Sequence, residues 1–516
     1  MKIFKLLSII LIINCSAVFA QTDSGVEFFW GALKSDAPRL NKVINFNDEE
    51  LIVLYGKYKV NKSIYTIERQ NSDFEPLQSS TFEILNDRRT YYLDIKKIGN
   101  EIILFTTKIN KGTKTLLAQR FDPNTLTLSE ETVALAQVNF KGKPSNYTKE
   151  FKIESSPNKN LFLLYSTPFN DELAEKSVTV SVLNSTLKPI WNSVIGKSKE
   201  SVEIKYTDGL VTNKGDVFIY AQEEVKRKDK INKSDPSKVH VIYGLKKNGS
   251  VFKEYKLEQK DKKLSSPKLY MDTLIGSLLL GGFYINTEAE NEKGIFLTSI
   301  NTTTDQTLFS QFHPFDLDFI KQGKKDWEKK EIDKNREGDF TQYFLQHIVS
   351  TPDKGYIITG EYIRLSGYTP EGSTFIKYEY FHNDVLVFKL NANGEKAWNK
   401  KIIKRQNTLD VAKNFASYSF FQNADKLHFI YNEIQDAEEQ TNIETGEIST
   451  FYVNDNIFNT VLVTFNEVGE VKKEVLFHSY EMGAKFAPHY SDQTWKNELL
   501  IYGIDENKSI FGAFSF

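Results

Sequence analysis

The chain alternates short apolar runs with polar turns that are rich in Gly and Asn. Eight of these runs directly follow a polar turn, and they begin near residues 51, 101, 161, 216, 276, 355, 427 and 498. Several of them, such as LIVLY at 51–55 and LLLGGFY at 278–284, are continuous rather than alternating. Continuous apolar runs of this length are typical of strands that are covered on both faces. The pattern therefore predicts an all-β fold with a recurring buried strand.

A hairpin follows most of the buried strands. Residues 384–402, DVLVFKLNANGEKAWNKKI, place an apolar run before a polar turn that ends at Gly394, and a second strand follows. The same arrangement recurs at 460–477 and 239–257, where the turns again end in Gly. A Gly in this place supplies the left-handed backbone that a short hairpin loop requires. Weaker copies turn on Asn or Asp, which tolerate that conformation, at 115–128, 178–191 and 295–309.

Each repeating unit thus contains four strands joined by turns. The buried strands are 50 to 79 residues apart (101 − 51 and 355 − 276), and a four-stranded meander repeated at such intervals is typical of a β-propeller. The units, with GEKAW at 394–398 as a Gly turn followed by Trp, resemble the blades of secreted β-propeller repeat proteins. No Trp-Asp repeat and no sialidase-type box occurs, so the resemblance is to the general blade pattern. It implies eight four-stranded blades, with seven as the alternative.

The two ends of the chain are expected to meet in the last blade. The final unit contains the buried strand near 498–504 and one more strand at 509–516, but no fourth strand, while GVEFFWGAL at 25–33 belongs to no unit. We expect 25–33 to close the ring as the outer strand beside 509–516, because an open blade would expose an unpaired edge. The eight blades are expected at about 38–86, 87–140, 146–197, 199–259, 262–313, 342–405, 410–478 and 480–516, with an inserted loop or helix near 314–341.

The first 20 residues resemble a secretory signal. Lys2 and Lys5 precede an apolar stretch at 6–13, and Val18-Phe19-Ala20 ends in a small residue, so we expect cleavage after Ala20. Lipoprotein anchoring through Cys15 is less favoured, because Asn14 is larger than the small residue such a site requires. No later run is long enough for a transmembrane helix. The protein is therefore expected to be exported, to the periplasm, the outer membrane surface or the extracellular space.

Composition narrows the classes of partner. Cys15 is the only Cys, so an exported chain without disulfides must be stabilised by a large core. Removing the signal leaves a formal charge of −4 (64 Lys and Arg against 68 Asp and Glu). Acidic and basic residues are mixed along the chain, unlike the basic stripe of a nucleic-acid binder. We therefore expect no nucleic-acid partner.

The second turns of the units and one connection between units are much longer than the other turns. They occupy 168–177, 223–238, 285–294, 363–383, 433–459 and 314–341. In a four-stranded blade these segments share one face, and long insertions on one face are where repeat proteins usually bind. Solvated loops without a function are the alternative. The segment 317–334 suggests a short helix with Leu317, Ile320 and Trp327 on one side. Aromatic residues concentrate in these loops, and we predict a binding surface that includes Trp327, Tyr368, Phe375, Tyr378, Tyr380, Phe381, Phe451 and Tyr452.

Catalytic and metal-binding patterns are missing from the sequence. It has no GxSxG, HExxH, CxxC or phosphate-binding glycine loop. None of the His residues has a second His three or four residues away; only His382, next to Asp384, and His313 fall near the long-loop face. The carboxylates at 433–447 match no calcium loop. We therefore expect no catalytic residues, no metal and no cofactor.

These observations favour a non-catalytic propeller that binds a protein of the cell envelope or the extracellular space through its long-loop face. A propeller that binds or acts on glycans in its central funnel is the alternative, because aromatic loops suit sugar faces. The two differ in where acidic and aromatic side chains gather: in the funnel for a glycan, or on an exposed patch for a protein.

Overall fold

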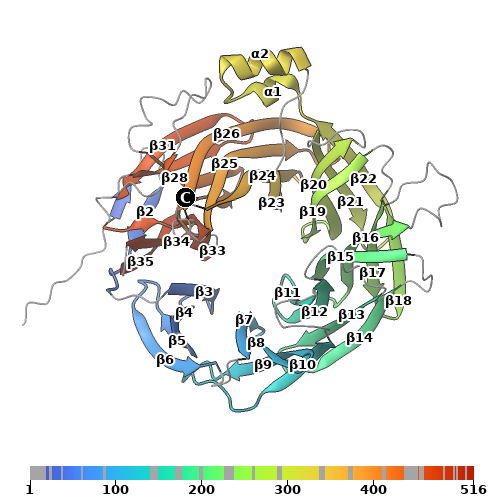
Figure 1. The fold of residues 1–516 in the computed structure, drawn as a ribbon, viewed down its shortest axis with the longest axis vertical. Helices are drawn as coiled ribbons and strands as arrows, with labels where there is room; N and C mark the ends of the chain where they lie inside the picture. The colour runs from blue at the N-terminus through green and yellow to red at the C-terminus, as the bar shows by residue number, and fades with distance from the viewer. Residues whose placement is uncertain are drawn as a thin grey trace, which may run out of the picture.

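The computed structural model of the chain is a ring of eight β-sheets around a central axis (Figure 1). It describes residues 19–21, 26–35, 39–59, 62–84, 89–139, 149–168, 177–196, 202–225, 238–257, 262–286, 293–335, 343–369, 376–409, 414–434, 451–452, 458–479, 483–491, 494–495, 498–505 and 508–515. The all-β, eight-bladed architecture predicted from the repeating units is confirmed, and the seven-bladed alternative is wrong. Among the described residues, no helix is long and apolar enough to cross a membrane.

Blades 1 to 4 are antiparallel sheets of four strands taken in chain order. Blade 1 contains β3 (Arg39–Asn45), β4 (Leu51–Lys59), β5 (Lys62–Gln70) and β6 (Pro76–Glu83). Blade 2 contains β7 (Thr90–Ile98), β8 (Glu101–Asn110), β9 (Thr113–Phe121) and β10 (Val133–Asn139). Blade 3 contains β11 (Lys149–Ser155), β12 (Leu161–Pro168), β13 (Ser177–Asn184) and β14 (Pro189–Gly196). Blade 4 contains β15 (Val202–Val211), β16 (Val217–Val225), β17 (Lys238–Lys246) and β18 (Val251–Lys256).

Blades 5 to 8 follow the same plan with additions. Blade 5 contains β19 (Lys262–Asp272), β20 (Ser277–Asn286), β21 (Gly294–Asn301) and β22 (Thr307–Pro314). Blade 6 contains β23 (Tyr343–Ser350), β24 (Tyr356–Tyr368), β25 (Lys377–Leu390) and β26 (Lys396–Leu409), with β29 (Phe451–Tyr452) added parallel to β26. Blade 7 contains β27 (Ser419–Asn423), β28 (Lys426–Ile434), β30 (Phe458–Phe465) and β31 (Val471–His478). Blade 8 contains β32 (Lys485–Phe486), β33 (Thr494–Trp495), β34 (Glu498–Asp505), β35 (Lys508–Ser515), β2 (Glu27–Trp30) and β1 (Phe19–Gln21).

Strands from both ends of the chain pair in blade 8. β2 runs antiparallel to β35, with Glu27 opposite Ser515 and Trp30 opposite Gly512. Trp30 is 3% exposed and packs edge-on against Phe477 of blade 7, with ring centroids 5.6 Å apart. The strand expected near 25–33 therefore lies beside 509–515, but it is not the outer strand of the blade, because β1 pairs with its other side. Val26, Phe28 and Trp30 belong to the core between blades 7 and 8.

Neighbouring blades are joined by a repeated aromatic–glycine contact. The indole of Trp398, on the outer strand of blade 6, lies against Gly469 in the last hairpin turn of blade 7, where a Cβ would come within 2.8 Å of the ring. Trp191 of blade 3 lies against Gly249 of blade 4 in the same way, at 2.9 Å. Gly469 and Gly249 have φ values of +81° and +78°, which favour Gly. The Trp on the outer strand of one blade and the Gly turn of the next blade thus join successive blades.

The insertion between blades 5 and 6 forms two helices rather than one. α1 (Leu317–Lys321) and α2 (Asp326–Asn335) lie at the outer rim of the ring beside β26 (Figure 1). Gly323, with a φ of +74°, separates the helices. The expectation that Ile320 and Trp327 share one side of a single helix is wrong, because the break lets each helix turn its own face inward: Ile320 is 8% exposed and Trp327 is 66% exposed.

Candidate functional site

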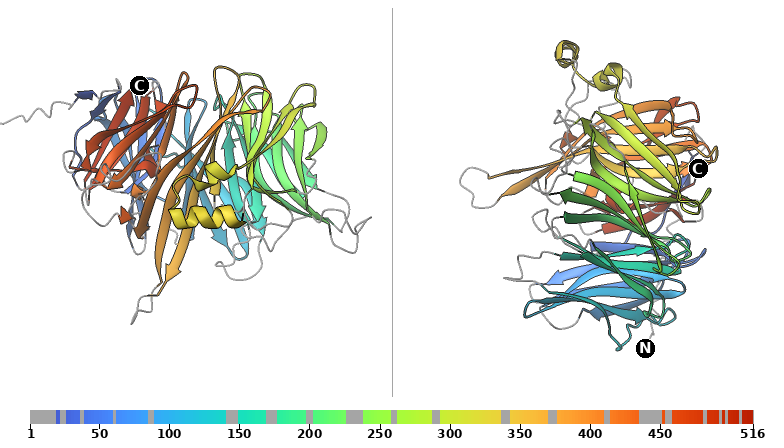
Figure 2. Two further views of the ribbon diagram at one scale, coloured as in Figure 1. Left: turned by 90° about the horizontal axis from the view of Figure 1, so that it is seen from above. Right: turned by 90° about the vertical axis from the view of Figure 1, so that its right-hand side faces the viewer.

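A long hairpin joins β24 to β25 and projects from one face of blade 6 (Figure 2). β24 pairs with β23 only as far as Tyr362. Beyond this point the described residues of β24 pair with β25, up to Tyr368 opposite Lys377. β26 also pairs with β25 as far as Leu409 opposite Glu379, so only the outer end of the projecting ribbon is two-stranded. The alternation of side chains along the strands decides what each of its two faces presents.

One face of the projecting ribbon is apolar. Leu365 lies opposite Tyr380, and Gly367 lies opposite Tyr378, so their side chains share a face. Leu365 is 55% exposed, Ile376 57% and Tyr378 40%. Gly367 leaves room for its neighbours, because a Cβ there would lie 3.2 Å from Ile376 and 3.3 Å from Tyr378. We call Leu365, Ile376, Tyr378 and Tyr380 the hairpin patch.

The opposite face of the ribbon carries charge. The guanidinium carbon of Arg364 lies 4.1 Å from the centre of the Phe381 ring, a cation–π contact between directly opposed residues. Lys377 and Glu379 are on the same side. Arg364 and Lys377 are exposed, so the charged face of the ribbon keeps the hairpin in water while the hairpin patch stays apolar.

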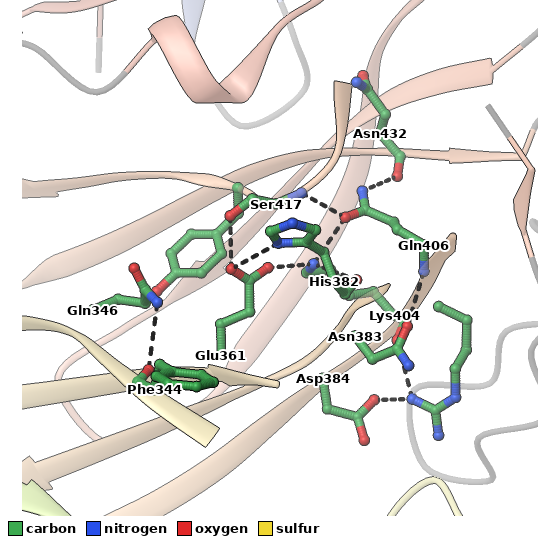
Figure 3. Close-up of polar contacts among 12 residues, drawn as sticks. Phe344, Gln346, Glu361, His382, Asn383, Asp384, Lys404, Gln406, Ser417 and Asn432 are labelled. Carbon is green, nitrogen blue, oxygen red and sulfur yellow. Dashed lines mark hydrogen bonds and ion pairs between the residues drawn. The ribbon is translucent and has the colours of Figure 1, made fainter. Parts of the chain in front are cut away.

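A buried ion pair lies at the base of the hairpin (Figure 3). Lys404 Nζ, from β26, is 2.7 Å from Glu361 Oε1, from β24, and each side chain is 1% exposed. The other carboxylate oxygen accepts a hydrogen bond of 2.7 Å from Ser417 Oγ. His382 Nδ1, from β25, is 3.4 Å from the same oxygen. Both oxygens of the buried carboxylate are therefore satisfied, as a buried charge requires.

The same cluster connects the hairpin to blade 7. Lys404 Nζ also donates to the Gln406 side-chain oxygen at 2.9 Å, and the Ser417 amide donates to that oxygen at 2.8 Å. Gln406 Nε2 donates to the Asn432 carbonyl of β28 at 2.8 Å. Asn432 Nδ2 in turn donates to the Phe486 carbonyl of blade 8 at 2.8 Å. A continuous network thus holds the base of the hairpin against the two following blades.

Electrostatics keep the carboxylate of the buried pair ionised. Burial alone would raise the pKa of Glu361, but Lys404 and His382 outweigh burial and lower this pKa to about 2. Burial lowers the pKa of the Lys404 ammonium, and Glu361 opposes that shift. Glu361 is therefore ionised at neutral pH, and its attraction to Lys404 acts in a region of low dielectric constant.

This arrangement does not form a nucleophile and base. Ser417 and His382 both contact the carboxylate of Glu361, so the serine hydroxyl donates to the acid and not to the imidazole. A serine nucleophile requires a base that accepts its proton. Glu361 is also fully buried, and the cluster holds the base of the hairpin in place.

Charged side chains of the innermost strands surround the central axis. In five blades the register of the innermost strand shifts just before a charged or titratable residue, which is the position of a β-bulge. These residues are Lys42, Asp94, Asp208, Lys268 and His347. Asp94 lies 3.5 Å from Lys42 and 3.3 Å from Lys96. Asp208 accepts the amide of Leu269 of the next blade at 2.7 Å. Asp94 and Asp208 are thus bound to other groups of the chain, whereas burial together with these two neighbouring acids raises the pKa of Glu154, on the innermost strand of blade 3.

The structure brings together only part of the predicted binding surface. Tyr378, Tyr380 and Phe381 are on the projecting ribbon, but Phe381 is on the charged face. Trp327 is on α2 at the rim. Only the backbone is described for Tyr368, which pairs with Lys377, and for Phe451 and Tyr452, which pair with Gln406 and Asn407. Phe375 lies outside the described residues.

Sequence reasoning missed Leu365 and Ile376, and it missed the buried cluster apart from His382. The two aliphatic residues could have been found from strand alternation with Tyr378 and Tyr380. Of the two His residues considered, His382 contacts Glu361, and His313 Nε2 lies 2.7 Å from the Gly394 carbonyl at the junction of blades 5 and 6. Both His residues therefore contact other groups of the chain.

No family model and no curated protein matches the sequence. Similar solved structures include the beta-propeller domain of the Trilobed protease from Pyrococcus furiosus, at 11% identity over 86% of this chain and 97% of that chain, with a TM-score of 0.36. Prolyl oligopeptidase B from Galerina marginata is similar at 9% identity over 91% of this chain, with a TM-score of 0.40, and this chain spans 56% of its length. The chain itself, by its sheet topology, is an eight-bladed β-propeller.

Proposed function

We propose that this chain is an exported, non-catalytic β-propeller that binds a partner protein of the cell envelope or extracellular space through the hairpin patch. The observation that carries the proposal is the exposure of Leu365, Ile376 and Tyr378 on one face of a ribbon that projects beyond the ring. Apolar residues gathered on one exposed surface mark interaction sites. The signal-like first 20 residues support export.

The partner is a protein that presents an apolar surface to the hairpin patch and acidic groups to the opposite face of the ribbon. Leu365 and Ile376, beside Tyr378, form an apolar surface that can pack against an apolar surface of another protein. Arg364 and Lys377 give the opposite face of the described ribbon a net positive charge, against the single acid Glu379. Asp94 and Asp208 of the central channel are bound to lysines and an amide, and the exposed apolar side chains lie on the ribbon, which favours a protein partner over a glycan in the funnel.

A shortened hairpin tests the proposal. Replacing 366–379 with Asn-Gly joins Leu365 to Tyr380, which are directly opposed and suit a two-residue turn. Glu361 and His382 are retained, so the base of the hairpin is preserved. The partner is first captured from the cell envelope on the intact chain, identified and purified, and its affinity for each variant is then measured.

We expect the shortened chain to lose the partner, and Leu274→Asn to retain it. Leu274 is 65% exposed in the first turn of blade 5, on the opposite face, and serves as the matched control. Equal affinity of the shortened and intact chains would overturn the proposal.

A further inference from the structure

A pocket of about 380 Å3 lies between blades 6 and 7, at the opposite end of β24 from the hairpin patch. Its walls come from the short turns of both blades and from the strands between them. The lining residues are Thr351, Pro352, Asp353, Ile357, Lys389, Trp398, Ala424, Asp425, Leu427, Asn466 and Glu467. The volume falls in the range of small-ligand sites, about 300–1,000 Å3.

The floor of this pocket is apolar and fixed. Ile357 and Leu427 are 1% and 3% exposed. The indole N–H of Trp398 donates to the Glu467 carbonyl at 2.9 Å, and the ring packs against Gly469. Trp398 is therefore a fixed wall of the pocket, and binding of a ligand carries no entropic cost for ordering this side chain.

The rim of the pocket is acidic. Three carboxylates and one ammonium line it, from Asp353, Asp425, Glu467 and Lys389, so its formal charge is −3 + 1 = −2. The ammonium of Lys389 is already bound, at 2.7 Å from Asp353 Oδ1 and 2.5 Å from Thr351 Oγ1. The negative charge that a ligand would meet therefore resides on the exposed side chains of Asp425 and Glu467.

An ammonium group of the chain itself occupies a comparable position between blades 4 and 5. Lys246 Nζ reaches into the next blade, 2.5 Å from the Thr302 carbonyl, and pairs with Asp305. It lies 5.9 Å from the centre of the Tyr255 ring. Thr302 of blade 5 and Glu467 of blade 7 hold equivalent places, because each directly follows an Asn (Asn301 and Asn466) at the start of the last hairpin turn of its blade. A cation, an aromatic ring and a carboxylate therefore meet at that junction, whereas between blades 6 and 7 the corresponding carbonyl, of Glu467, accepts the Trp398 indole N–H instead.

We infer that the pocket between blades 6 and 7 binds an ammonium or guanidinium group on an apolar stem, as in a Lys or Arg side chain of a peptide. The stem packs on Ile357, Leu427 and the Trp398 indole, and the cation reaches Asp425 and Glu467. This site is on the other face from the hairpin patch and does not depend on the proposed function.

Calorimetric titration of two peptides tests the inference. Acetyl-Gly-Lys-Gly-amide carries the cation, and acetyl-Gly-norleucine-Gly-amide keeps an apolar stem without charge. We expect the Lys peptide to bind at least about tenfold more tightly, a difference of about 1.4 kcal/mol, and to weaken as salt is added.

Two variants separate the site from general charge effects. Asp425→Asn combined with Glu467→Gln should reduce the affinity for the Lys peptide at least about tenfold. Glu395→Gln, an exposed acid in the last hairpin turn of blade 6 outside the pocket, should leave it unchanged. All three positions are exposed, so folding is preserved. Equal binding of both peptides, no binding at millimolar concentration, or an unaffected double variant would overturn the inference.

Discussion

Lys404 and Glu361 form an ion pair 2.7 Å apart with each side chain 1% exposed, and this pair lies directly beneath the projecting hairpin. Removing one member of a buried pair leaves an uncompensated charge, which typically costs about 3–5 kcal/mol. We therefore expect Lys404→Met to lower the free energy of unfolding by about this amount, measured by urea denaturation. Lys404→Met combined with Glu361→Gln should recover part of the loss. If the double variant is as unstable as the single one, the pair does not act as a unit.

Acid should destabilise the fold in two stages. Burial lowers the pKa of His240, His347 and His428 to about 4 from 6.5. The unfolded chain therefore takes up protons first, so stability falls as the pH drops from 6.5 to 4, by about 2–3 kcal/mol for each fully buried His. The pKa of Glu361 is lowered from 4.5 to about 2, so its protonation causes a second loss of stability as the pH falls from 4.5 to 2.

Urea denaturation at pH 7, 5.5, 4 and 3 checks the two stages. Glu361→Gln should leave the first stage intact and flatten the second, because glutamine does not titrate. A free energy of unfolding that stays constant between pH 7 and pH 4 would contradict the assignment of the buried imidazoles.

Two glycines with the same backbone conformation separate the cost of the turn from the cost of the contact between blades. Gly469 and Gly276 have φ values of +81° and +69°. A Cβ at Gly469 would meet Trp398 at 2.8 Å, whereas nothing lies within 4 Å at Gly276. Gly276→Ala should cost about 1 kcal/mol for the backbone alone, and Gly469→Ala about 1–3 kcal/mol more. Thermal denaturation of both variants measures the difference, and equal losses would show that the Trp contact contributes nothing.

Ring closure should depend on Trp30. Its side chain is 3% exposed and packs on Phe477, and its strand is the one that joins the start of the ring to its end. Trp30→Ala should cost about 3–5 kcal/mol in a single cooperative transition. Val194, on the outer strand of blade 3, is 63% exposed and serves as the control. Val194→Ala should change the free energy of unfolding by less than about 0.5 kcal/mol.

The fold was accessible from sequence because each blade repeats the same local signals. A buried run such as 51–55 and a Gly turn such as the one at Gly394 recur in register, and each is decided by neighbouring residues. The two-helix insertion could not be predicted from the sequence, because the break at Gly323 depends on the packing of that residue against Ile403 of β26.

The candidate site was only partly accessible. Tyr378 and Tyr380 were found from the aromatic content of a long loop. Glu361, Lys404 and Asn432 come from three different strands, and no local pattern indicates that they meet. The pocket between blades 6 and 7 likewise combines turns that are far apart in the chain, so its acidic rim appears only once the blades are placed side by side.

The central claim, that the hairpin patch binds a partner protein, is tested most directly by photo-cross-linking in cells that produce the protein. A benzophenone amino acid is placed at Tyr378 in one variant and at Leu274, exposed on the opposite face, in another. The account predicts a discrete cross-linked protein from position 378 and none from position 274. No adduct at 378, or the same adduct from both positions, would contradict it.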